Sequence, residues 1–325
     1  MGFLGPFLYS QLFVTPEYPS KSFAGQTIIV TGSNTGLGLE AARHFVRLGA
    51  EKVILAVRNL DAGETAKSSI EESTGRKNIC EVWELDLASY ASVQAFAKRA
   101  SSELDRIDVL LENAGVATKI HFERAENHER TITVNVIGTF LLGLLLLPKL
   151  EETGTKNPVE KPRWTIVTSE VHALTNLPEC KDGNTFVNLD DPQKSNMNDR
   201  YPTSKLLEVL VVRELAQRIT NNNVVLNMLN PGLCHSTLWR ERNWPVLIFS
   251  LFSFVRTTEV GARCLVAGAA AGDESHGAYM TDGKVSNGHL SAFVTSDEGR
   301  NAQRKVWSEL KAILEDIVPG VTASY

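Results

Sequence analysis

The sequence predicts an α/β fold: a doubly wound parallel sheet of about seven strands, formed by a single domain. Short apolar runs rich in valine, isoleucine and leucine alternate with stretches of helical periodicity along the chain. Such alternation is typical of a parallel sheet whose crossover helices cover both faces. No linker, repeat or low-complexity tract interrupts the pattern over the 325 residues, so we expect one domain.

The first half of the chain contains four predicted strands, each followed by a predicted helix. The strands are the runs TIIV at 27–30, KVILAV at 52–57, EVWEL at 81–85 and DVLL at 108–111. The helices are expected near 37–48, 61–73, 89–104 and 126–150, where apolar residues recur at helical spacing.

The second half continues this alternation, with two long interruptions. The remaining predicted strands are RWTIVT at 163–168, VVLNML at 224–229 and AYMT at 278–281, with a helix expected over about 199–219. Irregular pieces at about 171–198 and 232–256 are predicted to be substrate-loop inserts, because long loops in compact domains are usually functional. We therefore expect an N-terminal arm at 1–25 and the domain at 26–325.

Composition and charge argue against several classes of function. The net charge is −5 with a pI near 5.9, and no dense run of lysine and arginine indicates nucleic-acid binding. The four cysteines, at 80, 180, 234 and 264, lie too far apart to suggest a zinc site or a disulfide scaffold. We expect no metal, and a reducing, cytoplasmic location.

The N-terminal arm is apolar but does not resemble a targeting segment. Residues 1–20 lack a basic region, contain prolines and are too short to span a membrane, so we expect no signal peptide. The longest apolar stretches elsewhere, 140–148 and 246–255, also fall below the roughly 20 residues of a spanning helix. No transmembrane segment is predicted, whereas peripheral contact with a membrane stays open.

A glycine-rich segment follows the first predicted strand and opens the first predicted helix. Gly32, Gly36 and Gly38 stand in the pattern TGxxxGxG at 31–38. Glycines allow a tight turn and close backbone approach there, and the amides of a helix N-terminus attract a pyrophosphate. An ordinary glycine-rich turn has the same letters, but the strand before and the helix after favour a dinucleotide site.

The second predicted strand ends in Arg58 rather than in an acidic residue. A carboxylate there would hydrogen-bond the adenosine ribose of NAD, whereas a guanidinium suits the 2′-phosphate of NADP. The sequence therefore predicts NADP(H) as the cofactor. A solvated arginine at a strand end is the alternative, and equal Michaelis constants for NADH and NADPH would contradict the prediction.

Tyr201 and Lys205 are four residues apart in a predicted helix and so share one face. A free tyrosine has a pKa of about 10, and a neighbouring ammonium stabilises its phenolate. Ser169 closes the preceding strand, at the carboxyl edge where ligands bind such sheets, and its hydroxyl is suited to orient a substrate carbonyl. Without the other motifs, Tyr201 and Lys205 would be interpreted as two residues on the surface of a helix. Ser169 would then be a strand-end serine that only hydrogen-bonds within a turn.

Three further motifs stand at suitable points. Asn113-Ala114-Gly115 follows the fourth predicted strand, and Asn135 lies in the long helix after it. Pro231-Gly232 follows the sixth predicted strand, where a rigid turn would border the cofactor. Alone, each asparagine would be an ordinary polar residue, and Pro231-Gly232 would be an ordinary turn.

Together these motifs resemble the short-chain dehydrogenase/reductase superfamily over about 26–316. The shared pattern is TGxxxGxG, Asp86-Leu87, the Asn-Ala-Gly triplet, Asn135, Ser169, YxxxK and Pro-Gly, in the order of the family. The resemblance implies a Rossmann fold and a hydride transfer from a nicotinamide. It also implies that Tyr201 donates the proton in reduction, while Lys205 lowers the pKa of Tyr201 and holds the nicotinamide ribose.

The same resemblance assigns the remaining roles. Asn135 would hold a water of the proton relay, and Ser169 would share the hydrogen bond to the carbonyl. Asp86 would contact adenine, and Ser236 would meet the phosphate or carboxamide region. The implied cofactor-binding residues are Gly32, Ser33, Asn34, Thr35, Gly36, Leu37, Gly38, Arg58, Asp86, Leu87, Asn113, Ala114, Gly115, Tyr201, Lys205, Pro231, Gly232, Cys234 and Ser236.

Within the superfamily, Arg58, His172 and the long interval from Ser169 to Tyr201 resemble the retinol-dehydrogenase and WW-domain-oxidoreductase branch. Fungal reductases of polyketide-like or terpenoid pathways are similar as well. We expect NADP-dependent hydride transfer to or from a ketone, aldehyde or secondary alcohol of a lipophilic secondary metabolite. A retinol- or steroid-type dehydrogenase and a non-catalytic NADP-binding sensor are the alternatives. The sequence contains no G-x-S-x-G motif, which argues against a serine hydrolase.

The insert after Pro231-Gly232 gathers aromatic residues at 238–255. They are Trp239, Trp244, Phe249, Phe252 and Phe254. A lid over a lipophilic substrate and plain packing, oligomer or membrane contact both fit this composition. His172 and His235 have no partner at metal-ligand spacing, so neither predicts a metal site. The family often forms dimers or tetramers, and a homodimer stays open.

Overall fold

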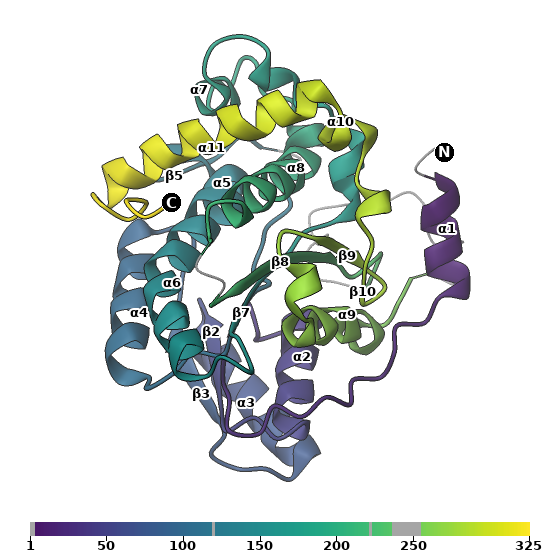
Figure 1. Cartoon of the computed structure of the whole chain (residues 1–325), viewed down its shortest axis with the longest axis vertical. Coiled ribbons are helices and arrows are strands. Elements are labelled where there is room, and N and C mark those ends of the chain that lie inside the picture. The colour runs from purple at the N-terminus through teal and green to yellow at the C-terminus, as the bar shows by residue number, and fades with distance from the viewer. Residues whose placement is uncertain (1–3, 119–120, 221–222, 236–254) are drawn as a thin grey trace.

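Eight strands form one sheet at the centre of the computed structural model, which describes residues 4–118, 121–220, 223–235 and 255–325 (Figure 1). The strand order across this sheet is β10-β9-β8-β7-β4-β1-β2-β3. The strands are β1 (Thr27–Thr31), β2 (Lys52–Val57), β3 (Cys80–Glu84), β4 (Val109–Glu112), β7 (Arg163–Val167), β8 (Val225–Asn230), β9 (Tyr279–Thr281) and β10 (Lys284–Val285).

Neighbouring strands from β3 through β9 all pair in parallel, which confirms the predicted doubly wound sheet. The sequence analysis did not predict the edge strand β10, which pairs antiparallel with β9. A two-residue turn joins them, with Asp282 at φ 54° and Gly283 at φ 78°. Asp-Gly with both residues at positive φ is a preferred hairpin turn, so the signal for this strand was present in the sequence.

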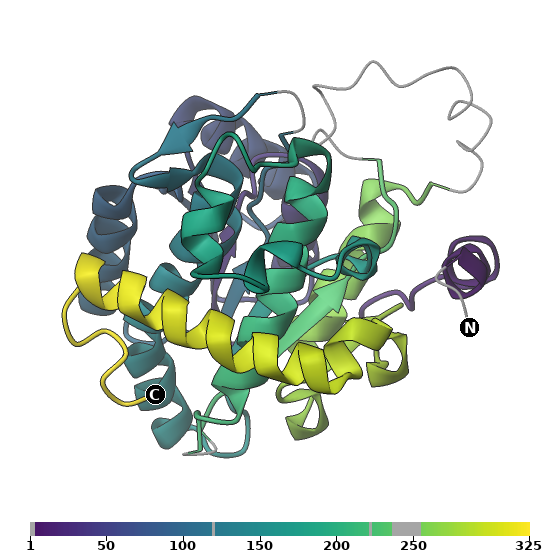
Figure 2. The ribbon, with the colours of Figure 1, turned by 90° about the horizontal axis from the view of Figure 1, so that it is seen from above.

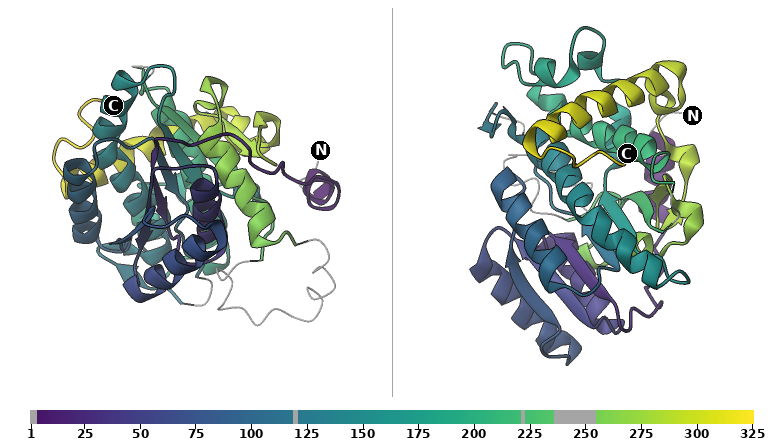
Figure 3. Two further views of the ribbon diagram at one scale, coloured as in Figure 1. Left: turned by 90° about the horizontal axis from the view of Figure 1, so that it is seen from below. Right: turned by 60° about the vertical axis from the view of Figure 1, so that its left-hand side comes forward.

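Helices cover both faces of the sheet, and each face has its own hydrophobic core (Figure 3). Strands β1, β4, β7 and β8 are buried along their whole length, as expected for parallel strands covered on both sides. One layer consists of α2 (Gly36–Arg47), α3 (Leu60–Thr74) and α9 (Thr258–Ala270). The other consists of α4 (Tyr90–Glu103), α6 (Thr139–Lys156), α8 (Met197–Ala216) and α11 (Asp297–Ile317).

The helix expected over 126–150 begins four residues later than predicted. A small hairpin of β5 (Arg124–Ala125) and β6 (His128–Glu129) precedes it. Its first turn is α5 (Arg130–Ile132), where the buried Glu129 side chain accepts hydrogen bonds from the amides of Thr131 at 3.0 Å and Ile132 at 3.3 Å. Residues 126–129, which the sequence analysis assigned to the helix, therefore belong to the hairpin, and Glu129 is the N-cap of the helix.

A π-helical stretch, η1 (Thr133–Gly138), joins α5 to α6. Among the described residues, the continuous segment Arg130–Lys156 is the one helix apolar and long enough to cross a membrane, and an 18-residue window within it has a mean hydropathy of 1.9. Within this protein, 89% of its apolar window is buried, because α6 packs against the sheet, where Phe140 contacts Trp164 of β7, and beside α4 in the same layer. This degree of burial is typical of a core helix.

The first predicted insert has more regular structure than a loop. It contains the 3-10 turns η2 (Glu170–Leu174) and η3 (Pro178–Cys180) and the short helix α7 (Thr185–Leu189). The ends of the second insert meet in a bridge between Cys234 and Arg256. Ser236 and the aromatic residues at 239–254 lie outside the described residues. The remaining short helices are η6 (Asp273–Ser275), η7 (Asn287–His289) and α10 (Ala292–Thr295).

The N-terminal arm begins with α1 (Leu4–Phe13), which lies beside the domain rather than within either layer (Figure 2). Its polar residues attach it: the Ser10 hydroxyl donates to Asp282 at 2.7 Å, and Arg256 donates to the Ser10 carbonyl at 3.0 Å. Farther along, the Tyr18 ring lies 4.4 Å from the Arg47 guanidinium and 5.2 Å from that of Arg263. Polar and cation–π contacts thus hold the first part of the arm. Near its end, Phe23 is buried in the core with its ring 4.9 Å from that of Phe45.

Candidate active site

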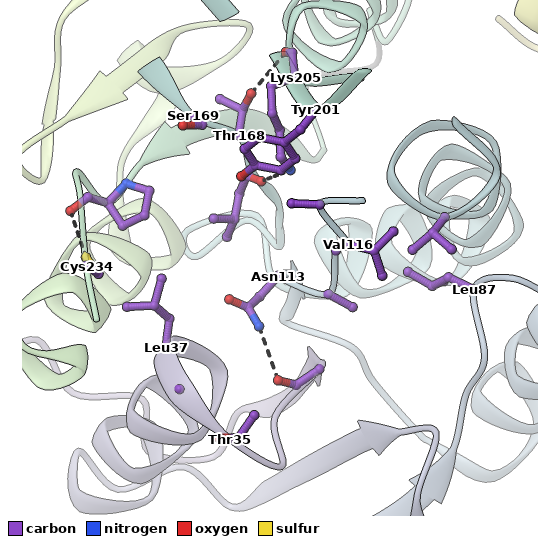
Figure 4. A pocket seen from close by; sticks show the side chains of 18 of the residues that line it. Thr35, Leu37, Leu87, Asn113, Val116, Thr168, Ser169, Tyr201, Lys205 and Cys234 are labelled. Carbon is purple, nitrogen blue, oxygen red and sulfur yellow. Dashed lines mark hydrogen bonds between the residues drawn. The ribbon is translucent and has the colours of Figure 1, made fainter. Parts of the chain in front are cut away.

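A cleft of about 490 Å³ opens along the carboxyl edge of the parallel strands (Figure 4). Its walls come from the segments that follow β1, β2, β4, β7 and β8, together with one face of α8. This is where ligands bind in doubly wound sheets, because the strand order reverses there and leaves a crevice. Most of the residues singled out from the sequence line this one cleft.

The glycine loop after β1 forms one end of the cleft. Gly32 has φ +66°, and a Cβ there would lie 2.9 Å from the Ala114 Cα. A Cβ on Gly38 would lie 2.6 Å from both the Gly32 carbonyl oxygen and the Asn113 amide nitrogen. Both positions therefore require glycine, and the first turn of α2 packs directly on the loop.

The N-terminus of α2 faces the cleft without a side-chain cap. Thr35 is the N-cap residue, and its side chain makes no capping hydrogen bond. Thr35, Gly36 and Leu37 line the cleft (Figure 4). The first amides of a helix have no partner within the helix, so this end is suited to bind an anionic group.

Asn113 supports the loop from the neighbouring strand. Its side-chain nitrogen donates to the Thr31 carbonyl at 3.0 Å. The Thr31 hydroxyl in turn accepts from the amides of Asn113 at 3.0 Å and Ala114 at 2.9 Å. These bonds join the ends of β1 and β4, so the Asn-Ala-Gly triplet holds the glycine loop in place.

Arg58 and Asp86 lie along the same cleft, at the ends of β2 and β3. The Arg58 side chain is exposed and forms no ion pair with another described residue. Asn59 beside it caps α3 by accepting from the Ala62 amide at 3.0 Å. One oxygen of Asp86 accepts from the Ala88 amide at 2.9 Å. Arg58 is therefore the charged group of this region that is available to an anion.

Tyr201, Ser169 and Lys205 meet at the other end of the cleft (Figure 4). Tyr201 is only 6% exposed, and its phenol hydrogen-bonds the Ser169 side chain. The Lys205 ammonium lies 5.6 Å from the centroid of the Tyr201 ring. Burial raises the pKa of Tyr201 above its ordinary value of 10.0, and the Glu208 carboxylate raises it further, whereas Ser169 opposes the shift.

Lys205 is anchored by two acceptors. Its ammonium donates to the Val167 carbonyl at 2.9 Å and to a carboxylate oxygen of Glu208 at 2.7 Å. Both side chains of this ion pair are buried, at 6% and 2% exposure. Sequence reasoning missed Glu208, although its position three residues after Lys205 on one helix face was a signal.

Asn135 lies behind the cleft and does not line it. Its side-chain oxygen accepts from the Val116 amide at 2.9 Å, and its nitrogen donates to the Val116 carbonyl at 2.9 Å and the Ser204 hydroxyl at 3.0 Å. A Cβ on Gly115 would lie 3.3 Å from the Asn135 oxygen and 3.9 Å from the Lys205 nitrogen. Asn135 and Lys205 therefore approach the same backbone position.

Two other predicted residues do not line the cleft. Ser33 is fully buried, and its hydroxyl donates to the Val30 carbonyl at 2.9 Å, so it supports the loop from inside. Gly38 packs beneath the loop. The cleft-lining residues that sequence reasoning did not name are Ala56, Val57, Leu85, Val116, Ala117, Thr118, Arg130, Val134, Val167, Thr168, Glu170, Val171 and Leu233.

His172 is a buried hydrogen-bonding residue. Its Nδ1 lies 2.9 Å from the Ser169 carbonyl, and its Nε2 accepts from the Ser291 amide at 3.2 Å. Burial lowers the pKa of this imidazole below its ordinary value. Within the part of the chain that the structure describes, no three histidine, cysteine or acidic side chains cluster as metal ligands would.

Known proteins are similar in sequence to this chain over nearly its whole length. A family model described as short chain dehydrogenase matches residues 26–157. The chain is 47% identical to a short chain dehydrogenase/reductase of Cryptosporiopsis sp., with 98% of this chain and 99% of that relative covered. It is also 47% identical to a short-chain dehydrogenase of Penicillium roqueforti, with 97% of this chain and 84% of that relative covered.

Solved structures share the fold at lower identity. A 3-ketoacyl-(acyl-carrier-protein) reductase from Brucella melitensis complexed with NADH has a TM-score of 0.61 at 20% identity, covering 80% of this chain and 97% of that chain. The Pseudomonas aeruginosa RhlG/NADP active-site complex has a TM-score of 0.61 at 22% identity, covering 84% of this chain and 100% of that chain. The two sequence relatives match almost the whole of this chain at 47% identity. The chain therefore belongs to the short-chain dehydrogenase/reductase family.

Proposed function

We propose that this protein is an NADP-dependent reductase or dehydrogenase that interconverts a ketone or aldehyde and an alcohol on a lipophilic secondary metabolite. One observation carries the proposal: the Tyr201 phenol, in contact with Ser169, lies in the same cleft as the glycine loop. A bound cofactor can thus reach from the loop to the phenol. The fungal relatives support a role in secondary metabolism.

The cleft fits the pyrophosphate and ribose portions of a dinucleotide. The loop at Gly32 leaves no room for a side chain, so a ligand there meets backbone amides. The uncapped N-terminus of α2 adds its dipole. The exposed Arg58 guanidinium at the end of β2 supports NADPH over NADH, because it offers charge-assisted hydrogen bonds to a 2′-phosphate.

The chain itself supplies proton transfer and orientation, while a bound NADPH would supply the hydride. In the direction of reduction, the Tyr201 hydroxyl gives its proton to the carbonyl oxygen as the carbonyl group is reduced to an alcohol. Ser169 donates a second hydrogen bond to that oxygen and so orients the carbonyl. The Lys205 ammonium stabilises the phenolate left on Tyr201.

Apolar side chains near the phenol support a lipophilic substrate. Val116, Val171 and Leu233 line the same cleft as Tyr201 and Ser169. Pockets for small molecules are generally apolar with a few polar groups that fix orientation, which is the arrangement here. The four free cysteines are consistent with the reducing cytoplasm that we propose as its location.

The test is to measure NADPH consumption by the wild type and by Tyr201→Phe against a panel of lipophilic ketones and aldehydes. We expect the variant to lose about 100- to 10,000-fold in kcat while binding NADPH normally by fluorescence titration, because only the acidic proton is removed. Tyr325→Phe, which alters a phenol bonded to Glu151 at 2.9 Å on a distant surface, is the matched control.

Three outcomes separate the alternatives. Turnover that depends on Tyr201 supports the enzyme, and the preferred panel member distinguishes a steroid or retinoid from other metabolites. NADPH binding without turnover by the wild type supports a sensor. Failure to bind either NADPH or NADH would contradict the proposal altogether.

A further inference from the structure

Glu208 is a buried acidic residue beside the proposed catalytic residues, and the mechanism above leaves it without a task. Its carboxylate lies 2.7 Å from the Lys205 ammonium, and its side chain is 2% exposed. A buried charge costs free energy unless it is paired, so each member of this ion pair offsets part of the cost of burying the other. Lys205 is also held by the Val167 carbonyl at 2.9 Å, on the cleft side of β7.

The second consequence of Glu208 is electrostatic. The Lys205 ammonium lies 5.6 Å from the centroid of the Tyr201 ring, and a positive charge at that distance favours the phenolate. The negative charge of Glu208 acts in the opposite direction and raises the pKa of the phenol. Charges within a few ångströms interact strongly where water is excluded. Glu208 therefore acts on the phenol through space and on the ammonium through a direct bond.

Several other groups face this pair from neighbouring elements. The hydroxyl of Thr168, directly after β7, donates to the Lys205 carbonyl at 3.1 Å. Glu170 in η2 raises the pKa of the Tyr201 phenol, as Glu208 does. Glu112 on β4 is fully buried and accepts a hydrogen bond from the Trp164 indole at 2.8 Å. Burial raises the pKa of Glu112 well above its ordinary value, which favours its neutral form.

We propose that Glu208 is a positioning residue of the catalytic site: its carboxylate anchors the Lys205 ammonium and sets how readily Tyr201 releases its proton. This inference rests on the proposed function, because it gives Glu208 a task in the same proton transfer. Burial raises the pKa of Glu208 to about 7, and the Lys205 charge lowers it, so the carboxylate charge responds to pH close to neutrality. The proton affinity of the phenol then depends on a group that never touches the substrate.

The test compares Glu208→Gln with Glu112→Gln as a matched control. Both replace a buried glutamate by an amide of the same shape, but only Glu208 forms an ion pair with the Lys205 ammonium, whereas Glu112 accepts from the Trp164 indole. We measure the pH dependence of kcat for alcohol oxidation at saturating NADP⁺. We also measure tyrosinate absorbance of the unliganded protein, with the Tyr201→Phe spectrum subtracted, over the pH range in which circular dichroism shows a folded chain.

In Glu208→Gln we expect the limb of the pH profile governed by Tyr201, and the tyrosinate transition, to move to lower pH by about one unit or more. The uncompensated Lys205 ammonium then favours the phenolate. Glu112→Gln should leave both curves unchanged. Glu208→Asp keeps the charge on a shorter side chain, so it should retain the wild-type pH profile while kcat falls because Lys205 is less firmly held.

Unchanged pH curves in a folded Glu208→Gln protein, or a shift to higher pH, would overturn the inference. If that variant does not fold, Glu208→Asp decides: a kcat equal to the wild type would contradict the positioning role. The two proposals fail separately. A wild type without turnover defeats the proposed function, and the tyrosinate titration still tests Glu208; Tyr201-dependent turnover with unmoved curves defeats only the role of Glu208.

Discussion

Arg58 and Tyr201 illustrate two ways in which a single residue acts in this cleft. Tyr201 is enclosed, so its chemistry depends on the buried charges around it. Arg58 is exposed and forms no ion pair with another described residue, so its chemistry depends on the ligand. Cofactor choice is therefore open to substitution at the surface, whereas proton transfer depends on the interior.

Replacing Arg58 by alanine should weaken NADPH and leave NADH nearly unaffected. A hydrogen bond to a charged group contributes about 1.5–3 kcal/mol, so we expect the KM for NADPH to rise about 10- to 100-fold. Steady-state kinetics with both cofactors would measure the ratio. Arg304→Ala, an exposed arginine on α11, is the control. An unchanged preference in Arg58→Ala would mean that another group reads the 2′-phosphate.

Glu170 makes stability depend on pH. Burial raises its pKa from 4.5 to about 7, and hydrogen bonding by Asn230 only partly opposes this. The folded chain therefore binds this proton more tightly than the unfolded chain does. The resulting stabilisation is complete below the unfolded pKa and is lost as pH rises through about 7.

Glu170→Gln should accordingly unfold at higher urea concentration than the wild type near pH 8. The expected gain is about 2 kcal/mol, because a neutral amide keeps an acceptor for Asn230 without a buried charge. Most of this gain should vanish at about pH 5, where the folded wild type is already protonated. Glu298→Gln, an exposed change in the first turn of α11, should change stability by a similar small amount at both pH values.

The N-terminal arm, which includes α1, is linked to the cleft through Arg256 and Gly232. Arg256 donates to the Val14 carbonyl at 3.1 Å in the arm and to the Pro231 carbonyl at 2.9 Å at the rim of the cleft. A Cβ on Gly232 would lie 2.3 Å from the Gln11 amide nitrogen. The arm therefore packs against the turn that borders the proposed cofactor.

Deleting residues 1–15 should destabilise the protein and weaken NADPH binding together. Arg256 is 6% exposed and would lose acceptors on the arm, which leaves part of a buried guanidinium unpaired. We expect a loss of about 2 kcal/mol, measured by urea unfolding, and a higher Kd for NADPH by fluorescence titration.

The control for this deletion is a pair of changes on the outer face of α1. Tyr9→Ser and Phe13→Ser alter side chains that are 63% and 74% exposed, so stability should change by no more than about 0.5 kcal/mol. A deletion variant as stable as the wild type would show that the arm does not support the turn at Gly232.

At the scale of the whole molecule, the cleft draws on strands from both halves of the sheet. Loops after β1 and β2 form one end, and loops after β7 and β8 form the other. A ligand that spans the cleft binds the folded chain alone, so it stabilises both halves together.

NADPH at about 100 times its Kd should raise the free energy of unfolding by about 2.7 kcal/mol in one cooperative transition. An equal concentration of NADH should raise it less, because it lacks the phosphate that Arg58 would bind. Differential scanning fluorimetry with each cofactor would measure the midpoints. Equal shifts for the two cofactors would contradict the assignment of Arg58.

The sequence by itself determined the parallel sheet and the edge where the site lies. Strands such as Thr27–Thr31 and Arg163–Val167 are runs whose apolar content and turn residues are local properties of the chain. Because the carboxyl ends of parallel strands meet at one edge, motifs placed after separate strands were bound to converge. Gly32, Asn113 and Ser169, which follow β1, β4 and β7, line one cleft for that reason.

Tertiary structure alone decided which charges are buried and what they face. The burial of Glu208 and Glu170 depends on how α8 and η2 pack, and the contact of Arg256 with the arm joins residues 246 positions apart. Asn113 turned out to hold the glycine loop, and Ser33 to support it from within. Periodicity reports which face of an element is apolar, whereas the pKa of a buried group depends on neighbours that only folding brings together.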